Sequence, residues 1–72
     1  MNFYESICLA KIFSIAMGYT PKSSITDQEI DVAVECLKKT ADQKQNWTEE
    51  TKQMYKTMAE LCGELSKHEK NQ

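Results

Sequence analysis

The chain has 72 residues, of which 40% are hydrophobic, and nine lysines against eleven carboxylates give it a formal net charge of −2. This length allows one small domain, and the apolar content is sufficient for a core, which excludes a wholly disordered chain. Every basic residue other than the single histidine is a lysine. Because arginine supplies the bidentate contacts to phosphate and guanine, a slightly acidic chain without it is not expected to bind nucleic acid.

The first predicted element is an α-helix over residues 2–17. Eleven of the fifteen residues from Phe3 to Met17 are apolar or aromatic, and a segment of this length is ordinary for a helix but long for a strand. Gly18 suits the left-handed position that follows a helix end, and Pro21 comes shortly after it. The sequence therefore predicts a helix that ends just before Gly18.

This apolar segment is not expected to enter a membrane or to act as a signal peptide. Lys11 interrupts the run, which is shorter than the roughly 20 apolar residues of a spanning helix. The residues before the run include Glu5 and no basic residue, whereas a signal peptide begins with basic residues. We therefore expect a cytoplasmic protein with no membrane partner.

The apolar residues of the first helix surround it instead of forming one stripe. A helix that is apolar on all sides is normally buried on all sides, and the two later helices offer only one stripe each. One side of the first helix would then be left in water, which predicts a homodimer or a complex with a protein partner. The expected interface residues are Phe3, Ile7, Leu9, Ile12, Phe13 and Ala16.

A second helix is predicted over residues 27–41. Thr26 and Glu29 have the spacing of a capping box, and Ile25 and Ile30 can pack together across the helix start. The helix is amphipathic, so one side should lie on the core and the other in water. The predicted core side consists of Ile30, Ala33, Val34, Leu37 and Ala41.

The third predicted helix covers residues 48–67, with Asn46 or Thr48 as its cap. Large and apolar residues recur along it at alternating spacings of three and four, which is typical of a heptad seam. Met54 and Met58 could form an adaptable binding surface, but methionines at helical spacing are more often core, and we interpret this seam as the core side of the helix. Gly63 then falls on the outer side. The predicted seam consists of Trp47, Thr51, Met54, Met58, Leu61, Leu65 and His68.

Together these elements predict an all-α fold, a small three-helix bundle that forms a single domain over residues 1–72. The short polar connection over residues 42–46 predicts that the second and third helices form an antiparallel hairpin, with the first helix packed across it. Residues 68–72 are expected to fray.

The residue types that carry chemistry do not form a recognisable site in the sequence. Cys8, Cys36 and Cys62 occur one per helix, without the paired spacing of zinc ligands, and they are expected to be reduced and structural. His68 lies near the end of the chain without a partner that would orient it as a general base. The sequon at Asn46 is read as a chance match. We expect no catalytic residue, no metal site and no cofactor.

The sequence thus favours a non-enzymatic interaction protein, such as a small regulator, adaptor or inhibitor, that self-associates through its first helix. One alternative is a small helix-turn-helix-like DNA-binding regulator, although its recognition helix would lead with Glu49 and Glu50, which phosphates repel. Another alternative is a metal- or redox-responsive protein that uses the three cysteines. Neither the partner nor the biological process follows from the residues.

Overall fold

The computed structural model describes residues 2–67, which contain three α-helices and no strand. Helix α1 spans Phe3–Ala16, α2 spans Asp27–Asp42 and α3 spans Glu49–Ser66. A short 3-10 helix at Lys22–Ser24 lies in the connection between α1 and α2. The all-α prediction is confirmed, and each predicted helix end lies within one residue of the observed one. The expected fraying of residues 68–72 falls outside the described residues, as does His68.

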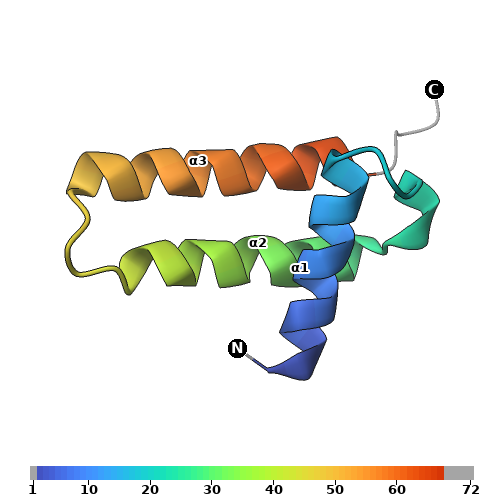
Figure 1. Cartoon of the computed structure of the whole chain (residues 1–72), viewed down its shortest axis with the longest axis horizontal. Coiled ribbons are helices and arrows are strands. Elements are labelled where there is room, and N and C mark those ends of the chain that lie inside the picture. The colour runs from blue at the N-terminus through green and yellow to red at the C-terminus, as the bar shows by residue number, and fades with distance from the viewer. Residues whose placement is uncertain (1, 68–72) are drawn as a thin grey trace.

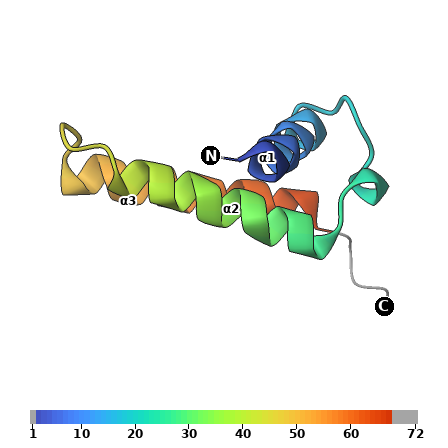
Figure 2. The ribbon, with the colours of Figure 1, turned by 90° about the horizontal axis from the view of Figure 1, so that it is seen from below.

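Helices α2 and α3 lie side by side and antiparallel, which confirms the predicted hairpin (Figure 1). Helix α1 crosses this hairpin close to the start of α2 and the end of α3. In the view of Figure 2, α1 lies on one face of the hairpin, and the hairpin extends well beyond it toward the α2–α3 connection. One helix across one end therefore covers only part of the hairpin.

Side-chain caps fix where the helices begin. At the start of α2, Glu29 N–H donates to Thr26 Oγ1 at 3.1 Å and Thr26 N–H donates to Glu29 Oε1 at 2.9 Å, which confirms the predicted capping box. Asn2 and Glu5 form a second capping box at the start of α1. Thr48 caps α3, because its hydroxyl accepts the N–H of Thr51 at 3.1 Å.

Helix α1 ends in a left-handed turn at Gly18, whose φ angle is +82°. The N–H of Tyr19 donates to the Ser14 carbonyl at 2.9 Å, and the N–H of Gly18 donates to the Ile15 carbonyl at 3.0 Å. This pair of bonds is a Schellman motif, and it satisfies two carbonyls that the helix end would leave unpaired. The predicted stop at Gly18 is confirmed.

The core lies where α1 meets the hairpin. Each helix contributes residues that solvent does not reach, but α1 and α2 supply the large ones while α3 supplies small ones. The ion pair between Lys11 and Glu29, with Nζ and Oε2 2.8 Å apart, joins α1 to the first turn of α2 beside this core. The buried residues are Cys8, Leu9, Ile12, Ile15, Ile25, Ile30, Ala33, Cys36, Leu37, Ala41, Ala59, Gly63 and Ser66.

The structure corrects the prediction for the third helix. Met54, Met58, Leu61 and Leu65 do not face the core: each is between 57% and 63% exposed. Thr51 of the predicted seam is also exposed and Trp47 is half-buried, while Ala59, Gly63 and Ser66 are buried instead.

The prediction that Gly63 lies on the outer side of the third helix was also wrong, because Gly63 faces α2. A Cβ added to Gly63 would lie 2.7 Å from Val34 Cγ2 and 3.5 Å from Ile30 Cγ2, so α3 meets the large side chains of α2 with its small residues. The apolar stripe of α2 fills much of the space between the helices, and the α3 side chains Tyr55 and Cys62 that pack against the core are only partly buried.

Candidate functional site

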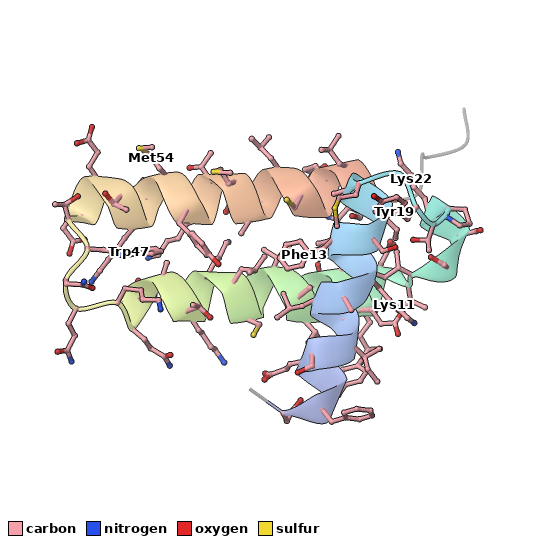
Figure 3. All side chains as sticks on the ribbon, in the orientation of Figure 1. Lys11, Phe13, Tyr19, Lys22, Trp47 and Met54 are labelled. Atoms are coloured by element: carbon pink, nitrogen blue, oxygen red, sulfur yellow. The ribbon has the colours of Figure 1, made fainter. Side chains whose placement is uncertain are left out.

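The most prominent surface feature is a line of large apolar side chains on α3. Met54, Met58, Leu61 and Leu65 are spaced by four, three and four residues, which keeps them in one line along a helix of 18 residues. We call these four residues the α3 seam. In Figure 3, Met54 projects from the side of α3 that faces away from α2. Solvent therefore reaches the seam in the folded chain.

On one side, the α3 seam continues into a shallow apolar pocket of about 210 Å³. Met58 contributes to this pocket from the seam, and Phe13 contributes from α1. Figure 3 shows Phe13 beside α1, in front of the gap between α2 and α3. The lining residues are Phe13, Leu37, Tyr55, Met58, Ala59 and Cys62. Apolar surface thus runs from α3 to α1 without a charged residue in the pocket.

On the other side of the seam, the helix carries acids and neutral polar groups. A second shallow pocket, of about 340 Å³, is lined by Glu50, Gln53, Met54, Thr57 and Met58. Acids are also concentrated at the start of α3, where Glu49 and Glu50 stabilise the positive end of the helix dipole.

The lysine side chains of α3 do not lie on the seam. Lys56 Nζ lies 2.6 Å from Asp42 Oδ1 on α2, and the side chain of Lys52 is largely covered. Lys67, directly after the helix, lies at the opposite end of α3 from Glu49 and Glu50. The start of α3 is therefore acidic, whereas at its end Lys67 Nζ lies 3.8 Å from Glu64 Oε2.

Of the six residues predicted on α1 as an interface, the structure exposes four. Phe3 is 81% exposed, and Ile7, Phe13 and Ala16 also reach solvent. Leu9 and Ile12 are buried against the hairpin and cannot contact a partner in the folded chain. Replacing either residue by glutamate would place a charge in the core and is expected to disrupt the fold.

Sequence reasoning missed several exposed apolar residues near α1. Tyr4 is partly exposed on α1, and Met17 and Tyr19 are exposed at its C-terminal turn. The helical spacing from Phe3 to Ile7 was the available signal for the outer side. The α3 seam was recognised as a pattern, but it was assigned to the core.

The cysteines and acids give no metal site among residues 2–67. Cys8 and Cys36 are buried, Cys62 is half-buried, and all three are free thiols. No group of three or more His, Cys, Asp or Glu side chains in this part of the chain has an arrangement that could hold a metal ion. Cys62 matters here only because it lines the apolar pocket beside the seam.

A further pocket, of about 470 Å³, lies between α2 and α3. Its charged side chains are partly paired with one another: Lys38 Nζ lies 2.7 Å from Glu60 Oε2, and this contact raises the pKa of Lys38. Val34, Leu61 and Gly63 form part of its wall. The arrangement is that of a surface groove between two helices, bridged by an ion pair.

The geometry lends no support to the DNA-binding alternative. The helix-turn-helix motif joins two helices at a steep angle by a short turn, whereas α2 and α3 are antiparallel (Figure 1). The exposed first turn of α3 carries Glu49 and Glu50, which the phosphate backbone repels.

Comparison with family models, curated proteins and solved structures gives no match to this chain. Within residues 2–67, none of the helices combines the length and the apolar character needed to cross a membrane. The functional interpretation therefore depends on the surface of the molecule itself.

Proposed function

We propose that this protein is a non-enzymatic interaction protein, a small regulator, adaptor or inhibitor that acts by binding another macromolecule in the cytoplasm. The observation that carries the proposal is the α3 seam, a continuous line of four large apolar side chains that are each about 60% exposed. Contiguous apolar patches of this kind usually mark interaction sites in soluble proteins.

The fold itself does not require apolar residues at these four positions. The hairpin is closed by small residues on the other side of α3, such as Ala59 and Gly63, and polar side chains at the seam positions would leave that packing unchanged. Full burial of a large aliphatic side chain is worth about 1.5–3 kcal/mol, so covering the exposed part of all four contributes roughly 4–7 kcal/mol. This gain offsets much of the association cost of about 4–15 kcal/mol.

The exposed part of α1 is the second component of the proposed binding surface. Phe13 borders the apolar pocket next to Met58, so a partner that covers the seam also reaches α1. Phe3, Ile7 and Ala16 lie farther along α1 and are accessible to the same partner or to another one. An interface that includes α1 thus remains part of the proposal, through these four residues and not through Leu9 or Ile12.

The test compares partner binding by two charge variants of the complete chain in its native host. In the seam variant, Met58→Glu and Leu61→Glu place two carboxylates on the seam. The matched control, Ser23→Glu with Gln28→Glu, adds the same charge at two exposed positions near the start of α2. Circular dichroism establishes that both variants keep the helical fold.

We expect tagged wild-type chain and the control to retain the same macromolecule, and the seam variant to lose it. The retained species is identified by mass spectrometry, and its affinity for the purified chain is then measured by calorimetry. If the seam variant binds that species as tightly as the wild type does, the α3 seam is not the functional surface.

A further inference from the structure

We propose that the α3 seam pairs with the α3 seam of a second copy of this chain, in an antiparallel homodimer whose twofold axis passes between Met58 and Leu61. This inference rests on the proposed function, because it names a partner for the same surface. It differs from the interface expected on α1, since α3 now forms the centre of contact.

The seam is complementary to itself in the antiparallel direction. Its spacing places Met58 and Leu65 at the a positions of a heptad, and Met54 and Leu61 at the d positions. With the axis between Met58 and Leu61, each a residue meets a d residue: Met58 packs against the partner's Leu61, and Met54 against the partner's Leu65. All four seam residues therefore find an apolar neighbour in a single register.

The charges along α3 select the antiparallel direction over the parallel one. Glu49 and Glu50 lie at the start of α3 and Lys67 follows its end. An antiparallel pair keeps the acidic helix starts of the two copies apart, places each beside the partner's end of α3, where Lys67 is paired with Glu64, and opposes the two helix dipoles. A parallel pair would instead bring four carboxylates together at one end, where they repel.

The residues beside the seam are compatible with the same arrangement. Tyr55 and Cys62 border the seam on the side of the apolar pocket. In the antiparallel register, Tyr55 lies near the partner's Cys62, so apolar groups face each other there. On the opposite border, Glu64 lies near the partner's Thr57, which avoids a pair of facing carboxylates.

The area of the seam suits a dimer of modest affinity. Four large side chains at about 60% exposure leave roughly 400 Å² of apolar surface on each copy, the size of the largest apolar patch on a typical monomer, which is often functional. With the bordering side chains, two copies would bury roughly 1,000–1,200 Å², which is the lower limit for a specific complex. Helix α1 lies on one face of the hairpin, so it does not have to move for α3 to pair (Figure 2).

The first experiment measures the oligomeric state by sedimentation velocity over a range of concentrations. We expect the wild-type chain and the Ser23→Glu/Gln28→Glu control to shift from monomer toward dimer as the concentration rises. The Met58→Glu/Leu61→Glu variant should stay monomeric with an unchanged helical spectrum, because its two substitutions are at exposed positions. A wild-type chain that is still a monomer at roughly 1 mM overturns the inference, since a dissociation constant near 100 μM would leave most chains paired.

The second experiment determines the direction of the two helices by disulfide formation. In a Cys62→Ala background, the remaining native cysteines are the buried Cys8 and Cys36. A mixture of Met54→Cys chains and Leu65→Cys chains should form the mixed disulfide under mild oxidation, while Met54→Cys chains alone should not. Efficient crosslinking of Met54→Cys chains to each other would indicate a parallel pair and overturn the antiparallel arrangement.

Failure of the dimer can be distinguished from failure of the proposed function. If the wild-type chain is monomeric but the host partner binds it and not the seam variant, the dimer is overturned and the proposed function remains. A monomeric chain that cosediments with vesicles of phosphatidylcholine and phosphatidylglycerol, with binding lost in the seam variant, assigns the seam to a lipid surface and also overturns the dimer.

Discussion

Gly63 and Val34 lie so close that a Cβ atom on Gly63 would be 2.7 Å from Val34 Cγ2. Contacts this short do not occur between well-packed carbon atoms, so α3 approaches α2 with room for a hydrogen only at this position. Val34 cannot easily turn away, because its β-branched side chain has one strongly preferred rotamer in a helix. The pair therefore sets how closely the hairpin can close.

Gly63→Ala should consequently lower the free energy of unfolding. Alanine gains about 1 kcal/mol in helix propensity over glycine, and overpacking costs about 1–3 kcal/mol, so we expect a net loss of up to about 2 kcal/mol. The measurement is urea unfolding followed by circular dichroism.

Val34→Ala provides the control for this prediction, because it removes the methyl group that the new Cβ would meet. The double variant should be more stable than the sum of the two single effects implies, by at least about 0.5 kcal/mol. Stabilisation by Gly63→Ala alone would show that propensity dominates and that the close approach is relieved at no cost.

The bounds of the helices are the part of the fold that the sequence could predict. Local signals were sufficient for the helix bounds, because Thr26 with Glu29, Thr48 and Gly18 act within one turn of the backbone. The box formed by Asn2 and Glu5 has the same spacing and was available as a signal.

The orientation of α3 could not be predicted in this way. Heptad spacing identifies a line of apolar side chains, but it does not state whether the line faces the same chain or a partner. That choice depends on the volume left by Ile30 and Val34 of α2, which only the small Gly63 fits. For the same reason, the candidate interface on α1 was predicted only in part: Phe3 and Phe13 are exposed, whereas the crossing of α1 over the hairpin buries Ile12.

The cap at the start of α2 gives a second prediction. Glu29 accepts the N–H of Thr26 with Oε1 and the ammonium of Lys11 with Oε2, at 2.9 Å and 2.8 Å. Thr26→Ala should lower stability by about 1 kcal/mol, and Glu29→Ala should lower it further, because it removes both a cap and the link to α1. The two substitutions should be non-additive in urea unfolding. Strictly additive effects would contradict the reciprocal box.

The charge of Glu29 should also make the stability of the fold depend on pH. Hydrogen bonds from Lys11 and from the Thr26 backbone lower the pKa of Glu29, and the bond to Glu29 raises the pKa of Lys11. The carboxylate then stabilises the fold at pH values above its unfolded pKa, and this contribution is lost as the pH falls through the lower folded value. The Lys11 contribution is fully present below its ordinary pKa and is lost only at strongly alkaline pH.

Glu29→Gln is the variant that isolates this effect, because an amide oxygen can still accept the Thr26 N–H. We expect the stability difference between wild type and Glu29→Gln to be constant near neutral pH and to shrink between about pH 5 and pH 2. Raised salt should reduce the difference at neutral pH, because Lys11 is partly exposed. A difference that does not change on acidification would mean that the charge of Glu29 contributes nothing.

The last prediction separates a surface seam from a core seam by stability alone. If Met58 and Leu61 face solvent, replacing both by glutamine should change the free energy of unfolding by no more than about 0.5 kcal/mol each in dilute, monomeric protein. If they faced the core, as heptad spacing suggested, each replacement would cost several times as much. Ile12→Ala is the matched control for a buried site, because Ile12 is 0% exposed, and it should cost about 2–5 kcal/mol.

Urea unfolding should then be repeated at high protein concentration. There the wild type gains stability from pairing and the glutamine variant does not, so the difference between them should grow with concentration. A large loss in dilute protein would place the seam in the core, while a small loss that is independent of concentration would leave the α3 seam exposed but without a second copy bound to it.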